Sequence, residues 1–517
     1  MTKDAPGYIS SDYNVNDLNT SQLNVNNPLE KKRFAVLFLF LVCTTTNGFQ
    51  WIQYSAVGGN MIFFYNESIP KGKADDLISL TTMIYMITYI ILVLPATFAL
   101  IKYGFRATFL AGSFINALGS FIKCFSISPN RFAIAMIGQT VASTAQIFTL
   151  GNPSYLAAVW FSDKHISTVA AMGVFGNQVG IALGFIIPSQ LIGGLNTIDE
   201  IACRMKIIMY TLTVIEILVF IFAIPFFKER PKKPPSDAQA SALLSKNMFG
   251  NVKHWYRSLK QLVINRNFIF LFIIYGIVTG VFYAISTNAY RYYEEYFPTN
   301  DKAAGIVGMI IVLSGLPGSI AAGFILDKTG AYKATVVGAC TLTLVFTVIF
   351  SFVVERSLEG NYFLSFLLGF CMTGFLPIGF EVAAEITYPI NEGLSSALLN
   401  VSAQIFGIAL ILLQLKIIDD FNVFKSNMFL CACLLVACII SFAAKMTKNR
   451  SSIVAKNNFL HAKNKGSSAL SLNATTNNNT DNNFEQSNDR NNSSSDENEQ
   501  HMPEEVRTNE SNGYIVS

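Results

Sequence analysis

Charged residues are scarce in this chain. Asp, Glu, Lys and Arg make up 14% of its 517 residues, whereas hydrophobic residues make up 51%. This balance excludes an ordinary soluble globular protein, in which about 25% of residues are charged. Apolar stretches of roughly 18 to 25 residues, each long enough to cross a bilayer, recur along most of the sequence. They predict an all-α membrane protein with twelve transmembrane helices, at about residues 34–57, 76–101, 107–126, 131–159, 166–193, 203–227, 267–290, 303–326, 333–354, 361–388, 394–418 and 425–446.

Residues that bind metals or perform catalysis are also few. The eight cysteines lie in or at the ends of predicted spans, and none of them forms a CxxC pair. We find no Ser-His-Asp set, no phosphate-binding loop and no cluster of metal ligands. The sequence therefore predicts no metal, no cofactor and no enzymatic activity. All four histidines lie in predicted loops or in the C-terminal tail, at His165, His254, His461 and His501.

Basic residues mark one side of the predicted membrane region. The cluster Lys31–Arg33 precedes the first span, and the loops expected on the same side collect most of the other Lys and Arg residues. By the positive-inside rule both termini are expected in the cytoplasm, and we expect the protein in the plasma membrane. In the first predicted outer loop Asn66 begins an Asn-Glu-Ser sequence, so it is a candidate glycosylation site. The polar segments 1–33 and 447–517 are predicted to be disordered cytoplasmic tails.

A phrase that occurs in both the fifth and the eleventh predicted spans indicates a duplication. Gln178-Val-Gly-Ile-Ala-Leu183 is echoed by Gln404-Ile-Phe-Gly-Ile-Ala-Leu410. A polar linker that contains prolines, residues 228–266, separates a first half at 34–227 from a second half at 267–446. Parallel repeats of six spans are typical of the major facilitator architecture, whose substrate site lies between the halves near the middle of the membrane.

A loop between the eighth and ninth spans supports this architecture. Gly323-Phe-Ile-Leu-Asp-Lys-Thr-Gly-Ala-Tyr-Lys333 resembles the loop signature of that superfamily. Its acid, Asp327, and its bases could latch neighbouring helices on the cytoplasmic side and release them as the halves rock. The alternative is a positively charged inner loop with no such role. The corresponding loop of the first half, Leu100–Arg106, lacks the acid, which predicts a degraded latch there.

Polar and aromatic side chains inside the spans suggest where a ligand binds. Asn47 and Trp51 lie one helical turn apart, so they share a face of the first helix. Trp51 could belong to an interfacial aromatic belt, but a belt residue faces lipid, and the shared face with an amide favours a cavity. Tyr283 lies at nearly the same depth in the seventh span. Gln178 and Gln404 are expected near the midplane, facing protein or a water-filled cavity.

Carboxylates inside predicted spans are the other polar candidates. Glu381 and Glu385 lie one turn apart in the tenth span, and Glu216 lies in the sixth. Buried carboxylates usually mark gates, proton steps or cation contacts. Glu385 is close to the inner end of its helix, which favours a structural gate. Glu381 lies one turn deeper and could serve either a gate or ion coupling.

The predicted site suits a ligand with a quaternary ammonium group. Such a cation donates no hydrogen bonds and is recognised by aromatic faces, here Trp51 and Tyr283. The amides of Asn47, Gln178 and Gln404 could bind a substrate hydroxyl or orient water. Haem would instead require basic residues for its propionates and an axial ligand such as His for its iron. The positions of the histidines disfavour haem, although Tyr, Cys or Met could also bind iron.

Several stretches of the predicted membrane region resemble the feline leukaemia virus subgroup C receptor-related family. The similarity extends over about residues 31–446 and excludes both tails. It implies a facilitator of choline, and in some members of ethanolamine, with a competing history as a haem transporter. It also implies an aromatic cage of Trp51 and Tyr283, assisted by Gln178 and Gln404. The stretches are Asn47-Gly-Phe-Gln-Trp-Ile-Gln-Tyr-Ser55, Gly176-Asn-Gln-Val-Gly180, Tyr275-Gly-Ile-Val-Thr-Gly280 with Phe282-Tyr283, Leu376-Pro-Ile-Gly-Phe-Glu381, Glu385-Ile-Thr-Tyr-Pro389 and Ala403-Gln-Ile-Phe-Gly407.

Three hypotheses are compatible with the sequence. The first is a choline-type facilitator that works by alternating access, with Glu381, Glu385 and Asp327 in gating or coupling. The second is a haem transporter. The third is a receptor or sensor that retains the fold without transporting its ligand. In each case we expect a monomer in the lipid bilayer with a small-molecule ligand and no nucleic-acid partner.

Overall fold

The twelve predicted spans are all helical in the computed structural model of the chain. No strand occurs among the residues that the structure describes. These are residues 32–70, 72–162, 165–231, 252–298, 300, 302–388, 390 and 392–445. The predicted C-terminal tail and nearly all of the predicted N-terminal tail lie outside the described residues.

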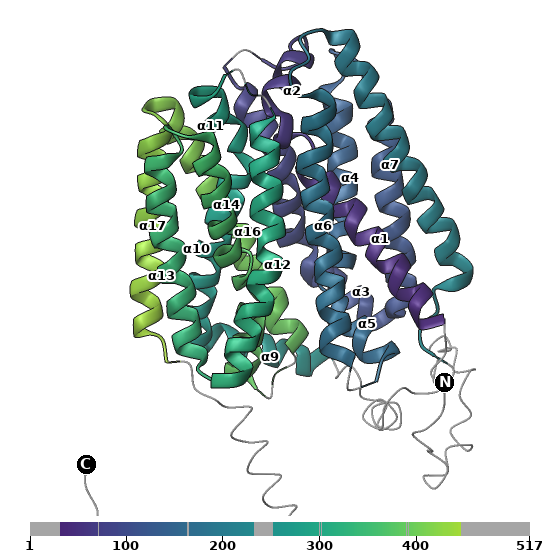
Figure 1. Cartoon of the computed structure of the whole chain (residues 1–517). Coiled ribbons are helices and arrows are strands. Elements are labelled where there is room, and N and C mark those ends of the chain that lie inside the picture. The colour runs from purple at the N-terminus through teal and green to yellow at the C-terminus, as the bar shows by residue number, and fades with distance from the viewer. Residues whose placement is uncertain are drawn as a thin grey trace, which may run out of the picture. The chain divides into compact units, whose positions relative to one another are not determined.

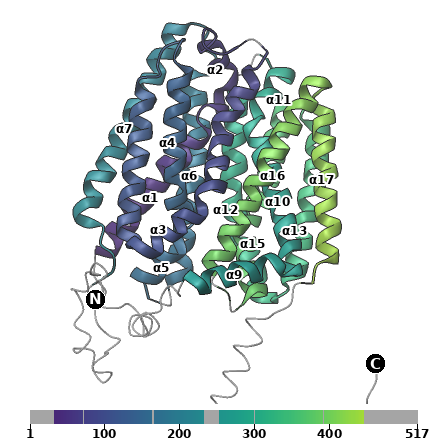
Figure 2. The same cartoon turned by 180° about the vertical axis from the view of Figure 1, so that it is seen from behind.

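The helices form two sets of six spans (Figures 1 and 2). Helix α1 begins and α17 ends on the lower side in Figure 1, which we call the termini side; α2 and α11 lie on the opposite side. The N-terminal half contains α1 (Lys32–Ile52), η3 (Ser55–Val57), α2 (Gly58–Phe64), α3 (Ala74–Cys124), α4 (Phe132–Leu150), α5 (Pro153–Trp160), α6 (Ile166–Ile192) and α7 (Ile198–Phe226). A short amphipathic helix, α9 (Val252–Ile264), precedes the C-terminal half. That half contains α10 (Arg266–Thr287), α11 (Ala289–Tyr296), α12 (Ala303–Thr329), α13 (Tyr332–Val353), α14 (Leu358–Met372), α15 (Phe375–Thr387), α16 (Glu392–Asp420) and α17 (Val423–Ala443).

Four spans that were predicted as continuous helices are broken. The first span is interrupted at Gln53 and Tyr54, and the seventh at Asn288. The fourth is interrupted at Gly151 and Asn152, before the helix that begins with Pro153. The tenth is interrupted at Thr373–Gly374, between α14 and α15. The breaks fall in the first and fourth spans of both halves, which is the pattern expected of a duplicated unit.

Glycines in α6 allow this helix to pack directly on α1. A Cβ atom at Gly180 would lie 2.0 Å from the carbonyl oxygen of Thr45, and one at Gly184 would lie 2.7 Å from that of Phe49. The Thr45 hydroxyl also donates a hydrogen bond of 2.8 Å to the carbonyl of Gly176. The glycines at positions 176, 180 and 184 thus form a small-residue ridge that packs against α1, the helix that carries Trp51.

A carboxylate from elsewhere in the chain lies at the loop between the second and third spans, although the loop itself contains no acidic residue. Gly104 turns the chain with a φ of 84°, in the region that favours glycine. The Glu229 carboxylate, from the segment after α7, accepts hydrogen bonds from the backbone amides of Phe105 (2.8 Å) and Arg106 (2.6 Å). The Arg106 guanidinium donates to the carbonyl of Ile224 at 3.0 Å. The local sequence does lack the acid, as noted above, and Glu229 supplies a carboxylate to this loop from a distant part of the sequence.

Replacing Glu229 with alanine is expected to destabilise the termini side of the N-terminal half. The carboxylate caps the free amides at the start of the third span, and the loss of such a cap costs about 0.5–2 kcal/mol. Thermal unfolding of the detergent-solubilised protein should therefore occur at a lower temperature. The exposed neighbour Lys228→Ala is the matched control. Equal melting temperatures for the two variants would contradict a capping role.

Candidate functional site

A small cavity lies where the two halves meet, and both predicted aromatic residues line it. Its volume is about 30 Å³, which is enough to hold water. A quaternary ammonium is several times larger. None of the lining side chains carries a charge, so the cavity suits a ligand recognised by ring faces and amides. The lining residues are Gly48, Trp51, Gln146, Leu150, Asn177, Ile181, Tyr283 and Gln404.

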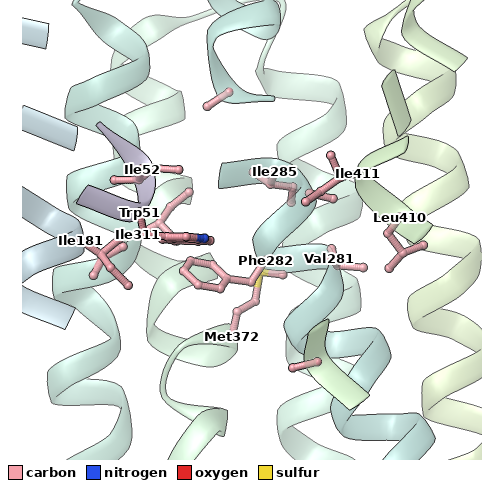
Figure 3. Packing of buried hydrophobic residues seen from close by; sticks show 14 of the residues in the cluster. Trp51, Ile52, Ile181, Val281, Phe282, Ile285, Ile311, Met372, Leu410 and Ile411 are labelled. Carbon is pink, nitrogen blue, oxygen red and sulfur yellow. The ribbon is translucent and has the colours of Figure 1, made fainter. Parts of the chain in front are cut away.

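Trp51 and Tyr283 meet across the boundary between the halves. Their ring centroids are 5.3 Å apart and the ring planes are inclined by 65°, an edge-to-face contact. Trp51 is 4% exposed, so it does not belong to an interfacial belt. Figure 3 shows it among the buried hydrophobic residues, with Ile181 of α6 and Phe282 of α10. A cation cannot lie between the rings in this arrangement, so ligand binding requires them to separate.

Gln404 of α16 also reaches the cavity, as predicted from its depth. It is buried and shares a hydrogen bond with the Tyr283 hydroxyl. A Cβ atom at Gly407 would lie 2.8 Å from the Tyr283 ring, so glycine at this position leaves room for the tyrosine. Tyr283 is thus oriented by one residue of α16 and accommodated by another. An amide and an aromatic face are presented together from the C-terminal half.

The structure does not bring the other two predicted amides to the cavity. The Asn47 amide donates to the side chain of Asn116 at 2.8 Å and to the carbonyl of Ala142 at 3.1 Å, inside the N-terminal half. Gln178 is absent from the cavity lining, where its neighbour Asn177 appears instead. Successive residues of a helix are rotated by about 100°. The depth estimated by counting residues along the sequence located the correct turn of α6. It did not determine which side chains of that turn face the cavity.

Gln146 of α4 is a cavity residue that sequence reasoning missed. The wall of α4 near its end also contributes Leu150, just before the break at Gly151. The sequence feature that could have indicated Gln146 as a cavity residue is its position shortly before the helix break at Gly151. The same argument would have applied to several other glutamines, so that signal alone was insufficient.

Ion pairs and hydrogen bonds join the halves on the opposite side. Asp75, at the start of α3, accepts a hydrogen bond of 2.8 Å from the Tyr290 hydroxyl and lies 3.4 Å from the Arg291 guanidinium. Arg291 also pairs with Asp419 at 2.8 Å, within the C-terminal half. Burial opposes the charge of Arg291, but Asp75 and the neighbouring acids outweigh it and raise the pKa of the guanidinium. Arg291 therefore remains a cation and holds Asp75, an arrangement that we call the Asp75–Arg291 latch.

The predicted gating residues lie away from the cavity. Glu381 is exposed and Glu385 is buried, one turn apart in α15 on the termini side. Asp327 lies in the last turn of α12, but its side chain is outside the described part of the structure. Asn66 is exposed in the turn after α2, on the opposite side, where a glycan could be attached.

Comparisons with known proteins match the fold and the resemblance. The family model of the Major Facilitator Superfamily matches residues 50–411. The chain is 40% identical over 426 residues to the choline/ethanolamine transporter flvcr2a of Danio rerio, covering 82% of this chain and 88% of that one. It is 40% identical over 428 residues to the choline/ethanolamine transporter FLVCR1 of Felis catus, covering 82% and 75%. The crystal structure of a bacterial homolog to the human lysosomal transporter Spinster shares the fold, with a TM-score of 0.62 at 14% identity over 81% of this chain and 98% of that one.

Proposed function

The chain belongs to the feline leukaemia virus subgroup C receptor-related family of the major facilitator superfamily, and we propose that it transports choline and, as a second substrate, ethanolamine. The family inferred from the sequence and the twelve-helix fold are confirmed. The protein is a multi-pass membrane transporter and not an enzyme. Relatives named choline/ethanolamine transporters support the choice of substrate.

The observation that supports this substrate best is the pair of aromatic rings in an uncharged cavity. A trimethylammonium group is attracted to ring faces by about 0.5–2 kcal/mol per ring, depending on how far the contact is desolvated. Trp51 and Tyr283 would provide these faces after they separate. Asn177, Gln146 and Gln404 offer amides to the hydroxyl of the substrate. A primary ammonium such as that of ethanolamine could donate hydrogen bonds to the same amide oxygens.

The origin of the two rings supports a mechanism of alternating access. Trp51 is held by the N-terminal half and Tyr283 by the C-terminal half, so rocking of the halves changes the distance between the rings. A substrate held by both rings is released when either contact is lost. In this proposal the Asp75–Arg291 latch closes the opposite side. Glu381, Glu385 and Asp327 take part in closing the termini side, which we assign to the cytoplasm.

We further propose that the protein resides in the plasma membrane as a monomer, with Asn66 on the outside and glycosylated. The exposed position of Asn66 after α2 supports this assignment. Expression in mammalian cells should give a band that shifts to lower apparent mass after glycosidase treatment. Asn66→Gln should remove the shift. A shift that persists in Asn66→Gln would mean that the glycan is attached at another residue, which would contradict glycosylation of Asn66.

Uptake of labelled choline into vesicles that contain the purified protein tests the proposed function. We expect saturable uptake that unlabelled ethanolamine reduces, and a pH gradient alone should not cause accumulation. Haem is the competing substrate to include, and no charged side chain lines the cavity to bind its propionates. Flux of haem without flux of choline would favour the haem transporter. Tight binding of choline without flux would favour a receptor or sensor.

A further inference from the structure

A chain of buried polar groups connects four helices of the N-terminal half behind Trp51. The Lys123 ammonium of α3 donates a hydrogen bond of 3.0 Å to the side-chain oxygen of Gln139 in α4. The Gln139 amide donates to the backbone carbonyls of Gln50 at 2.8 Å and Thr81 at 3.1 Å. The Gln50 amide in turn donates a hydrogen bond of 2.6 Å to the Glu216 carboxylate of α7. We call Lys123, Gln139, Gln50 and Glu216 the polar chain.

The polar chain acts on the broken end of α1. Because this helix ends at Ile52, its last carbonyls have no partner within the helix. Gln139 satisfies the carbonyl of Gln50, which is adjacent to Trp51 in sequence. Asn47, one turn earlier, is fixed by Asn116. Gln50 and Asn47 therefore anchor this turn to the N-terminal half, while Gly48 and Trp51 of the same turn line the cavity.

The charges in the polar chain are costly to bury, so their position requires a reason. Lys123 is fully buried and Glu216 is 2% exposed. A charge at such a depth is destabilising unless opposite charges and hydrogen bonds compensate for it. Here the two ionisable groups can carry opposite charges, and they are linked through Gln139 and Gln50. A Cβ atom at Gly138 would lie 2.5 Å from the Lys123 side chain, so a glycine makes room for the lysine.

Further groups converge on the same two charges. The Asn116 amide donates to the Glu216 carboxylate at 3.0 Å, beside the bond from Gln50. The Lys123 ammonium lies 6.0 Å from the centre of the Tyr54 ring, within the range of a cation–π contact. Tyr54 belongs to the break itself. Lys123 therefore reaches the break itself, through Tyr54, and the end of α1 before the break, through Gln139 to Gln50.

We propose that Lys123, Gln139 and Glu216 are positioning residues for substrate recognition. They fix the last turn of α1 and thereby determine where Trp51 stands opposite Tyr283. None of the three lines the cavity, so their effect on the substrate is transmitted through Gln50 and the backbone of α1. This inference rests on the proposed role of Trp51 as a wall of the substrate site.

A double-mutant cycle tests the inference. Gln139→Leu removes the donor to the Gln50 carbonyl, and we expect the KM for choline to rise about tenfold with little change in Vmax, as for the loss of a buried hydrogen bond. In a Trp51→Ala background the same substitution should leave KM unchanged, because Gln139 acts through Trp51. Asn361→Leu is the matched control, since Asn361 is also a buried amide that donates to a carbonyl, that of Val354, but in the C-terminal half. Equal effects of Gln139→Leu in both backgrounds would overturn the inference.

A second variant separates positioning from general instability. Removing either buried charge alone leaves the other uncompensated, so Lys123→Met and Glu216→Gln should each lower the yield of folded protein. The double variant has no ionisable group to bury at either position and should recover much of that yield. Its KM should still be raised, because Gln139 has lost the donor that orients it. Recovery of both yield and KM would reduce the polar chain to a structural role.

Tryptophan fluorescence gives a readout that does not depend on transport. With Trp160 and Trp255 replaced by phenylalanine, only Trp51 emits, because the chain has three tryptophans. Gln139→Leu should then shift the emission to longer wavelength and increase quenching by acrylamide. Unchanged emission and quenching would refute positioning of Trp51 whatever the transport result. If Trp51→Ala itself leaves KM unchanged, the proposed role of Trp51 in the substrate site fails, whereas the fluorescence still shows whether the polar chain positions Trp51.

Discussion

Replacing Trp51 with alanine is expected to raise the KM for choline about thirtyfold, which corresponds to about 2 kcal/mol of lost cation–π attraction at a desolvated ring. Trp51 is nearly inaccessible and faces Tyr283 of the other half at 5.3 Å, so its loss removes one of the two ring faces of the site. Trp51→Phe keeps a ring of weaker attraction and should give an intermediate KM. Initial rates of labelled choline uptake over a range of concentrations provide the measurement.

The control for this experiment is a second buried tryptophan. Trp160 lies in a different hydrophobic cluster of the N-terminal half, with Phe105 and Phe227, and not at the cavity. Trp160→Phe should therefore affect yield without raising KM. Ethanolamine offers a further comparison, because its ammonium can still donate hydrogen bonds to amides when the ring is lost. If Trp51→Ala transports choline with the wild-type KM, the aromatic site is excluded.

The positions of the spans could be predicted because they depend on a property that is local in sequence. About twenty apolar residues are needed to cross the membrane wherever the helix packs. The depths of Trp51, Tyr283 and Gln404 follow from the same count, since each residue adds 1.5 Å along a helix. These three residues do line the cavity. Depth along the membrane is thus accessible from a single sequence.

Rotation about the helix axis and long-range partners were not accessible in the same way. Asn47 shares a face with Trp51 on an ideal helix, yet its amide is satisfied inside the N-terminal half. Asn177, and not Gln178, lines the cavity, although the two residues are adjacent in α6. The Glu229 cap lies more than a hundred residues from the amides that it binds. Such contacts are decided by packing between helices, which a single sequence does not reveal.

The helix breaks were missed for a related reason. Glycine or proline marks the breaks in the fourth and tenth spans, but the first span is broken at Gln53 and Tyr54, which are neither. There the polar chain satisfies the freed carbonyl of Gln50, so tertiary partners stabilise a break that local propensity does not predict. The consequence is functional in our proposal, because Trp51 lies close before this break. To predict this break, one would have to know that Gln139, in a neighbouring span, contacts the end of α1.

Reversing the charge at the Asp75–Arg291 latch is expected to open the opposite side. Arg291→Glu replaces an attraction to Asp75 with a repulsion. Because the two side chains are 24% and 27% exposed, the attraction that is lost and the repulsion that is gained are each limited to about 1 kcal/mol. The change of about 2 kcal/mol should move the ratio of closed to open molecules about thirtyfold towards the open form. Ser189 is buried where α6 meets Gly305 of α12, so a cysteine at this position reports the opening by reaction with a membrane-impermeant maleimide.

Two further variants make the latch experiment decisive. Cys203 is exposed and Cys124 and Cys433 are partly exposed, so all three must first be replaced by serine for labelling to report on Ser189→Cys alone. Combining Asp75→Arg with Arg291→Glu restores the attraction in reverse and should return labelling towards the wild-type rate. Arg131→Glu, an exposed charge reversal on the same side within the N-terminal half, should have no effect. Because a transporter must close this side once in every cycle, a latch that is too weak should also slow net transport by depleting the closed state. Labelling that rises equally with Arg131→Glu would show that surface charge, and not the latch between the halves, controls opening.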